Sequence, residues 1–373
     1  MPSAADAPAA RRFVFLAVPY ALFALALAAV EGIVRATEPH VSRLDFFVTS
    51  PAQQAQLMDR QRLSIFEGDP LLCWRLRPGL RDVVWDQTPV TTNAAGLRYP
   101  RDVGAKAPGT FRILCVGDSV TFGVRVPLVF LKRPNDRDPA WRPYPARLED
   151  ALRAANPGRT IEALPLAVPG SSTHQGLAWL ARDLGAYSPD LVLLQFGWND
   201  TSLRSAADEE AMPTARAQVL ARALVSRSQA LMRAWRLWHR PGSAVLASPA
   251  SVPRVPLPRF VENHLRMAAL ARANGAAVAV VGPVFRDPVE HPDEAARVRA
   301  YRAALRGAMA ERGIPYVEVP ELTEDGWPGN EKLFLEHIHP NHAGHRVLAR
   351  ALLAFLSHRR LLGGLEVSAE PSS

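Results

Sequence analysis

Apolar residues between positions 111 and 319 form short runs, separated by longer stretches with a helical period. The runs Phe111–Val116, Leu191–Phe196 and Ala276–Val281 are mostly apolar, which is typical of parallel strands covered on both faces. Two further strands are expected at Thr160–Leu166 and Pro315–Val319. The longer stretches predict helices at Tyr144–Ala155, His174–Tyr187, Pro258–Asn274, Asp293–Arg312 and Asn341–His358.

This regular alternation of strands and helices predicts the α/β class, with a doubly wound parallel sheet between two layers of helices. Such sheets place their functional sites at the carboxyl ends of the strands. We therefore expect functional residues directly after Val116, Leu166 and Phe196, and near the ends of the two later strands.

The N-terminus has a different character. Two arginines precede the uncharged apolar run Phe13–Val30, which would rise roughly 27 Å as a helix. Two interpretations compete: an uncleaved signal anchor over residues 13–34, or a signal peptide cleaved after Ala26-Leu27-Ala28. The run is longer than a usual signal-peptide core, which favours the anchor. Residues 1–12 would then be a cytoplasmic tail, with the rest of the chain outside the cytoplasm.

Three further regions follow the apolar run. Residues 35–109 hold short strand-like pieces between Pro and Gly, and we interpret them as an ancillary region rather than a second full domain. The alternating pattern occupies residues 110–358, and a disordered tail is expected over residues 359–373.

Two stretches inside the alternating part, Arg125–Arg142 and Thr201–Pro256, have the character of insertions. The second contains Val219–His239, which predicts one amphipathic helix with Trp235 and Trp238. We expect this helix to pack in the core or form a lid, rather than to contact a membrane.

Composition excludes several classes of protein. Hydrophobic residues make up 48% of the chain and charged residues 21%, which excludes a disordered chain, and two cysteines exclude a disulfide scaffold. A bridge between Cys73 and Cys115 has no support, since Cys115 lies in a predicted buried strand. The net charge of +8 would suit nucleic acid, but the arginines are spread along the chain without a recognisable binding motif. We expect no nucleic-acid partner.

Polar segments follow the first three strands. After the first comes Gly117-Asp118-Ser119-Val120-Thr121-Phe122-Gly123, in which Ser119 can present its hydroxyl at a strand-to-helix turn. Gly170 follows the second strand with an unobstructed backbone N–H, and Asn199 follows the third with a side-chain amide. Taken singly, each is also explained as a helix cap or turn residue.

A fourth segment, Glu336-His337-Ile338-His339-Pro340, precedes the last helix. A carboxylate three residues ahead of a histidine can orient its imidazole and stabilise the imidazolium, which favours His339 over His337 as a base. A zinc site on Glu336 and the neighbouring histidines is disfavoured, because no HExxH motif is present and no cysteine lies nearby.

These four segments, in this order, resemble the blocks of the SGNH, or GDSL-type, hydrolase family. The resemblance covers roughly Phe111 to Leu356, and Asn93–Arg98 is similar to an N-x-x-G-x-R motif ahead of the first block in bacterial members. It implies a flavodoxin-like sheet and no metal or other cofactor. The implied catalytic residues are Ser119 as nucleophile, His339 as base and Glu336 as its orienting partner. The implied oxyanion hole consists of the backbone N–H groups of Ser119 and Gly170 and the side chain of Asn199.

Two positions depart from the family pattern. Glu336 stands where the family usually has Asp, and its extra methylene changes the reach of the carboxylate. Pro165 and Ala167 stand where the second block often carries Asn and Gly. The departures concern the orientation of His339 and the shape of the oxyanion hole.

The expected function is an extracytoplasmic, membrane-anchored serine esterase that removes a small acyl group from a glycan or lipid through an acyl-enzyme. Two alternatives stay open. One is an O-acyltransferase that uses the same serine and histidine on a cell-surface glycan. The other is a membrane-tethered binding protein without catalysis.

Overall fold

The computed structural model describes residues 7–48, 65–128, 141–238, 252–286, 292–323 and 329–367. A five-stranded parallel sheet lies at its centre, in the order β6-β5-β7-β10-β11. The strands are β5 (Phe111–Gly117), β6 (Ile161–Ala167), β7 (Leu191–Gln195), β10 (Ala277–Val281) and β11 (Tyr316–Val317). When these five strands are numbered in chain order, they lie in the order 2-1-3-4-5, which is that of flavodoxin-like sheets. This order confirms the predicted doubly wound α/β class.

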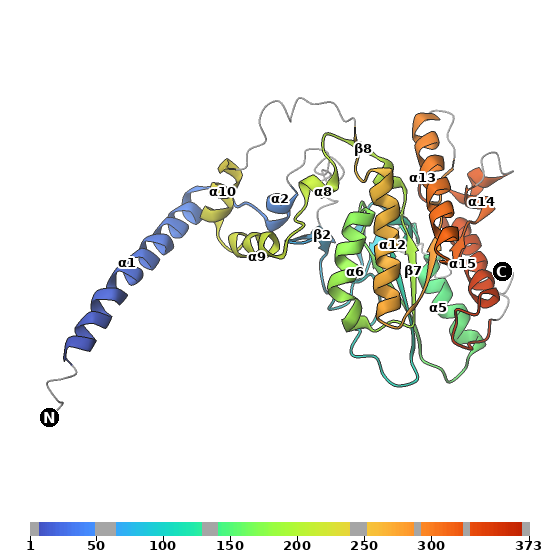
Figure 1. Ribbon diagram of the computed structural model, residues 1–373, viewed down its shortest axis with the longest axis horizontal. Coiled ribbons are helices and arrows are strands. Elements are labelled where there is room, and N and C mark those ends of the chain that lie inside the picture. The colour runs from blue at the N-terminus through green and yellow to red at the C-terminus, as the bar shows by residue number, and fades with distance from the viewer. Residues whose placement is uncertain are drawn as a thin grey trace.

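Helices cover both faces of the sheet (Figure 1). One face carries α6 (Thr173–Tyr187), α12 (Leu257–Ala273) and α13 (Pro292–Glu311), and the other carries α5 (Tyr144–Ala155) and α15 (His342–His358). Successive residues of a strand point to opposite faces. In β5, Leu114 and Val116 therefore join the core beneath α6 and α12, whereas Ile113 and Cys115 join the core beneath α5 and α15. Burial on both faces explains why the strands are so apolar.

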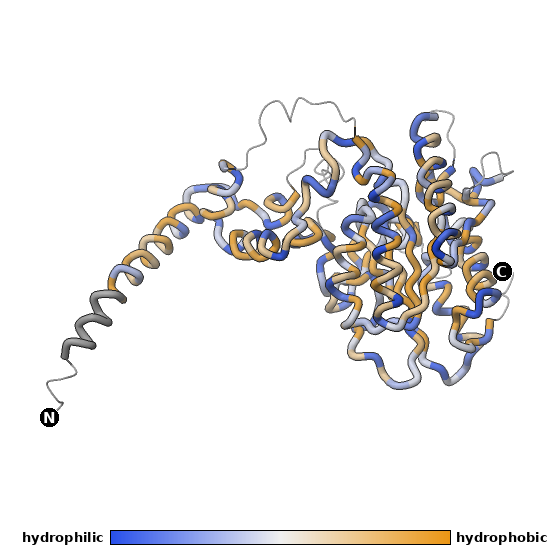
Figure 2. The backbone as a smooth tube through the Cα atoms, in the orientation of Figure 1, coloured by the Kyte–Doolittle hydropathy of each residue, from blue (hydrophilic) through white to orange (hydrophobic). Residues whose placement is uncertain are grey.

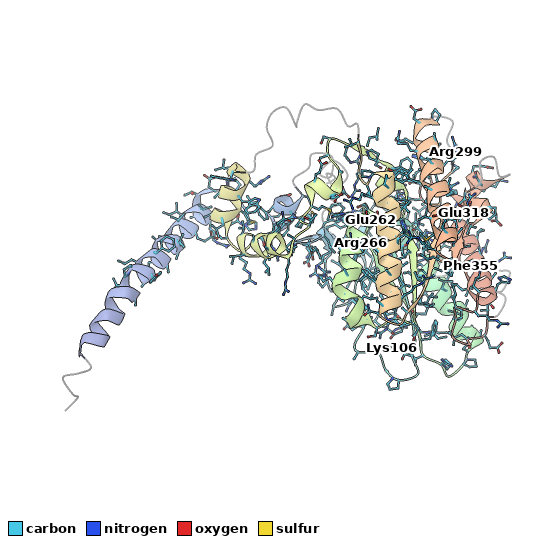
Figure 3. All side chains as sticks on the ribbon, in the orientation of Figure 1. Lys106, Glu262, Arg266, Arg299, Glu318 and Phe355 are labelled. Atoms are coloured by element: carbon cyan, nitrogen blue, oxygen red, sulfur yellow. The ribbon has the colours of Figure 1, made fainter. Side chains whose placement is uncertain are left out.

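The amino-terminal edge of the sheet is held together by Asp190. Its carboxylate accepts hydrogen bonds from Lys106 Nζ at 2.6 Å, labelled in Figure 3, and from the backbone N–H of Arg112 at 2.7 Å. Its backbone carbonyl accepts from the N–H of Ala277 at 2.8 Å. These contacts join the starts of β5, β7 and β10, whose carboxyl ends meet at the opposite edge.

The ancillary region consists of short elements that share a core with the α/β part. They are α2 (Arg43–Phe47) and two antiparallel hairpins, β1 (Phe66–Asp69) with β2 (Cys73–Leu76) and β3 (Val83–Trp85) with β4 (Thr88–Val90). Trp85 packs edge-on against Phe122, with ring centroids 6.0 Å apart. Cys73 and Cys115 are both buried and free.

The N-terminal apolar run lies within one helix, α1 (Ala7–Thr37), which extends away from the rest of the molecule (Figure 1). Residues Ala17–Thr37 are long and apolar enough to cross a membrane, and their side chains are almost all exposed. Such a segment is a candidate membrane span.

The second insertion departs from the prediction. It contains β8 (Leu203–Arg204), α8 (Asp208–Ala211), α9 (Arg216–Val225), α10 (Gln229–Trp238) and β9 (Val252–Pro253). The single helix expected over Val219–His239 is wrong, because the chain breaks at residues 226–228, where the carboxylate of Glu31 accepts from Ser228 Oγ and caps a new helix. Core packing is confirmed in part. Met232 of α10 lies in the core and Trp235 packs against Phe46, whereas α9 contains no fully buried residue and contacts the core through Val225.

Two further predictions, the first insertion and the disordered tail, concern segments that the structure describes only in part. Within the first insertion, residues 129–140 lie outside the described residues. In the expected disordered tail, residues 359–367 are described and pack on the α/β part: Leu362 and Leu365 are buried, and Glu366 N–H donates to Asn156. These apolar side chains extend the core beneath α15.

Candidate active site

Ser119 opens a short helix, α4 (Ser119–Phe122), directly after β5. The preceding Asp118 caps this helix, since its Oδ1 accepts from the backbone N–H of Val120 at 3.0 Å. Gly117 allows the chain to pass close to β7, because a Cβ there would lie 2.6 Å from the carbonyl oxygen of Gln195. The serine is thereby held in a tight turn at the carboxyl edge of the sheet, where the fold class places functional sites.

The other end of α4 is held by Arg98, the arginine of the Asn93–Arg98 motif. Its half-buried guanidinium donates to the carbonyl oxygens of Phe122 and Gly123, both at 2.7 Å. Burial lowers the pKa of Arg98 to about 9, so the group stays a cation at neutral pH. A cation on the last carbonyls of a helix is favourable. The motif therefore acts on the serine indirectly, by fixing the helix that it begins.

His339 lies beside Ser119, although 220 residues separate them in the chain. Its Nε2 is 2.9 Å from Ser119 Oγ, and its Nδ1 forms a short hydrogen bond with Oε1 of Glu336. When Nδ1 carries the proton and donates to Glu336, Nε2 is left as an acceptor for the serine hydroxyl. The structure thus brings together the three residues expected for catalysis.

The second oxygen of Glu336 is held by a residue that sequence reasoning missed. Arg125 Nη1 lies 3.2 Å from Glu336 Oε2, and Nη2 lies 3.2 Å from Asp86 Oδ1 on the β3–β4 turn. The backbone N–H of Arg125 donates to Thr88 Oγ1 at 2.6 Å. No sequence signal could have found this arrangement, because Arg125 and Glu336 are 211 residues apart.

These contacts keep Glu336 ionised. Burial raises the pKa of its carboxyl, but the hydrogen bond with His339 and the positive charge of Arg125 act in the opposite direction, and the pKa is lowered overall. An ionised carboxylate is what a neighbouring imidazolium needs for stabilisation.

The three expected oxyanion donors stand on the ends of three neighbouring strands, β5, β6 and β7. Asn199 Nδ2 donates to the carbonyl of Ser171 at 3.0 Å, and Ser171 Oγ lies 3.1 Å from the carbonyl of Gly117. An amide carries two protons, so Asn199 retains one for another acceptor. The loops after the three strands are therefore linked to one another around Ser119.

Gly170 adopts a positive φ of 80°, which favours glycine. The peptide before it is held by Trp74 of β2, whose Nε1 donates to the carbonyl of Pro169 at 3.1 Å. The peptide after it is held by Arg254, whose Nη1 donates to the carbonyl of Gly170 at 2.6 Å. Trp74 and Arg254 are two further residues that the sequence did not reveal.

An aromatic cluster connects the Asn199 loop with the histidine turn. Trp198 stacks on Phe285, with ring centroids 5.3 Å apart, and meets the edge of His337 at 5.0 Å. His337 therefore belongs to this cluster, while His339 faces the serine. The later histidines are engaged elsewhere: His342 stacks on Trp141, and Nδ1 of His345 accepts from the N–H of Tyr144.

Buried carboxyl groups lie beneath the site. Asp208 and Arg254 form a buried ion pair at 2.7 Å. Burial raises the pKa of Asp118 to about 6 and that of Asp200 to about 7. Asp200 is fully buried and accepts from the backbone N–H of Thr173 at 2.9 Å. Asp200 and Asp208 link the loops after β6 and β7, since they accept hydrogen bonds from Thr173 and Ser172.

Comparisons with known proteins agree with this geometry. A family model described as the GDSL-like lipase/acylhydrolase family matches residues 115–347. An arylesterase from Vibrio mimicus is 30% identical over 98 residues, which are 26% of this chain and 42% of that protein, so the chain spans less than half of that relative's length. The family match runs from β5 into α15, and it therefore contains Ser119, Gly170, Asn199 and His339.

Two solved structures are also similar. A lipase/acylhydrolase from Enterococcus faecalis has 17% sequence identity and a TM-score of 0.43, and the match covers 69% of this chain and 99% of that one. An acetylxylan esterase from Geobacillus stearothermophilus has 17% identity and a TM-score of 0.43, over 72% of this chain and 99% of that one.

Proposed function

Because the chain belongs to the GDSL-like lipase/acylhydrolase family, we propose that it is a serine esterase that cleaves an ester through an acyl-enzyme. The observation that carries this proposal is the distance of 2.9 Å between Ser119 Oγ and His339 Nε2, with Glu336 on the opposite nitrogen of the same imidazole. A nucleophile, a base within hydrogen-bond reach and a third group that orients the base are the geometry of nucleophilic catalysis.

The first half of the reaction forms the acyl-enzyme. Ser119 Oγ attacks the ester carbonyl carbon while His339 Nε2 takes the hydroxyl proton, and Glu336 stabilises the imidazolium. The developing oxyanion is held by the N–H groups of Ser119 and Gly170 and the amide of Asn199, and such a donor typically lowers the barrier by about 2.7–4 kcal/mol. His339 then gives its proton to the leaving alcohol as the carbon–oxygen bond breaks.

The second half releases the acid. Water donates a proton to His339 Nε2 and attacks the acyl carbon, and the proton returns to Ser119 Oγ as the acyl–oxygen bond breaks. If a sugar hydroxyl took the place of water, the same residues would transfer the acyl group. Hydrolysis is our primary proposal because water is the acceptor that requires no further site.

We place the catalytic part outside the cytoplasm, held to the membrane by α1, with a small acyl ester of a glycan or lipid as substrate. The support is the exposed apolar surface of Ala17–Thr37, together with the arginines that precede it. The substrate class follows from the location, since glycans and lipids carry the acyl esters at a cell surface.

The proposal is tested by Ser119→Ala, with the exposed Ser357→Ala on α15 as the matched control. We expect S119A to lose turnover of p-nitrophenyl acetate by about 10³-fold or more, and to lose labelling by a fluorophosphonate probe. S357A is expected to match the parent protein in both measurements.

Three results would contradict the proposal in different ways. Parental turnover in S119A would remove Ser119 as nucleophile. Failure of the probe to label the parent protein would favour a binding protein without catalysis. An acylated sugar as the main product, in place of the free acid, would favour an acyltransferase.

A further inference from the structure

Helices α9 and α10 carry an unusual amount of exposed apolar surface. Leu220 and Leu224 on α9 are 61% and 62% exposed, and Leu237 and Trp238 on α10 are 63% and 87% exposed. In the described part of the chain outside α1, every exposed large apolar side chain except Val252 lies on these two helices. We call four of these residues, two on each helix, the arm face: Leu220, Leu224, Leu231 and Trp238.

The arm face follows the geometry of both helices. Leu220 and Leu224 are one turn apart on α9, and Leu231 and Trp238 are two turns apart on α10, so each pair shares a side of its helix. On α10 the buried residues Gln229 and Met232 occupy the other side. Apolar side chains that gather on the exposed side of a helix are typical of a surface that binds another molecule or a membrane.

The charged residues of α9, α10 and the turn between them are all basic. Between Arg216 and Trp238 the chain contains five arginines and no acidic residue. Arg216, Arg227 and Arg236 are exposed. Helices with an apolar stripe and arginines around it are typical of segments that lie in the surface of a bilayer with anionic lipids.

Helices α9 and α10 lie near the C-terminal end of α1, as the backbone tube in Figure 2 shows, and α10 contacts it. Glu31 of α1 accepts hydrogen bonds from the backbone N–H groups of Gln229 and Ala230, at 2.9 and 3.0 Å. Gln229 also exchanges two hydrogen bonds with the backbone of Val41, at 2.8 and 3.0 Å. These contacts fix α10 beside the end of α1 that joins the rest of the chain.

We propose that α9 and α10 lie in the headgroup region of a bilayer containing anionic phospholipids, with the arm face turned toward the acyl chains. This rests on the proposed function, in which α1 anchors the chain in that same bilayer. Helices of this kind bury their apolar face about 5–10 Å into the boundary between headgroups and acyl chains. A second attachment beside α1 sets the orientation of the catalytic part, and so the distance of Ser119 from the membrane surface.

The test uses the full chain in vesicles of phosphatidylcholine and phosphatidylglycerol in equal parts. A cysteine introduced at Leu224 or Leu231 is labelled with an environment-sensitive nitrobenzoxadiazole dye, and vesicles containing nitroxide-labelled lipid serve as quencher. Matched controls carry the cysteine at the exposed Ala303 or Ala354 on α13 and α15. Cys73 and Cys115 are buried, and the unsubstituted chain measures their background. A further variant, Leu25→Cys, reports on α1.

We expect the nitroxide lipids to reduce emission at positions 224 and 231 by about twofold or more, as they do at position 25, and to leave positions 303 and 354 unchanged. Quenching at position 25 alone would overturn the arm proposal and leave the anchor standing. No quenching at position 25 would instead remove the anchor. Blue-shifted emission at positions 224 and 231 without quenching would show that protein covers the arm face, and would also overturn the proposal.

Discussion

At the scale of single residues, the proposed mechanism depends on charges that meet only in three dimensions. Glu336 has a longer side chain than Asp, and its second oxygen is held by Arg125, which is itself held by Asp86. We call the contacts of Arg125 with Asp86 and Glu336 the clamp. The clamp restrains the longer side chain of Glu336 and keeps its carboxylate ionised. We infer that Arg125 positions Glu336, and through it the imidazole of His339.

Replacing Arg125 by Gln is therefore expected to lower kcat by about tenfold, equivalent to about 1.4 kcal/mol of barrier, with little change in stability. The measurement is ester turnover alongside thermal unfolding. Arg125→Lys should recover part of the loss, because it retains the charge but not the two-armed contact.

The matched control for Arg125 is Arg306→Gln, which breaks the exposed pair with Glu318, labelled in Figure 3. It should leave kcat unchanged. Equal turnover in R125Q and R306Q would mean that the clamp has no part in orienting the imidazole.

At the scale of elements, the β1–β2 hairpin of the ancillary region reaches the expected oxyanion loop. Trp74 Nε1 binds the carbonyl of Pro169, which belongs to the same peptide as the N–H of Gly170. In a planar trans peptide the C=O and N–H point in opposite directions, so the indole sets the direction of the Gly170 N–H. We infer that the ancillary region helps to position the proposed oxyanion hole.

Trp74→Phe removes this donor but keeps an aromatic ring. We expect kcat to fall about tenfold at unchanged KM, since deleting an oxyanion donor outright costs 10²–10³-fold and this change only loosens one. Trp179→Phe is the control: its Nε1 donates to Asp183 within α6, at 2.9 Å. Identical kcat values for the two variants would count against the role of Trp74.

At the scale of the whole molecule, buried carboxyl groups link folding to pH. Burial raises the pKa of Asp200 to about 7, whereas an unfolded Asp titrates near 3.9. Between about pH 4 and pH 7 the folded protein therefore keeps a proton that the unfolded chain has lost. The free energy of unfolding falls as the pH rises through this window.

Asp200→Asn removes this titration. Relative to the parent protein, its Tm is expected to rise between pH 5 and pH 8, because only the parent loses stability over that range. Thermal unfolding across this pH range provides the measurement, and the exposed Asp293→Asn serves as control. A difference in Tm that stays constant with pH would show that Asp200 is ionised throughout.

The sequence by itself determined the sheet, its covering helices and the residues around Ser119. Strands buried on both faces must be apolar throughout, and helices against them must be amphipathic. Outside the two insertions, every predicted strand and helix of the α/β part therefore lies within two residues of its observed bounds. The four polar segments were visible because each follows a strand or precedes a helix whose place in the fold was already evident.

Only the tertiary structure decided what holds those residues in place and what the second insertion does. The contacts made by Arg125, Trp74 and Arg254 join residues that are 84 to 211 positions apart in the chain. Such contacts leave no pattern in the local sequence. The same holds for α9 and α10: an amphipathic pattern shows that one face is apolar, but whether that face meets the core depends on neighbours brought from elsewhere in the chain. Here Glu31 of α1 caps the start of α10, where the predicted single helix is broken. The arm face stays exposed, outside the core.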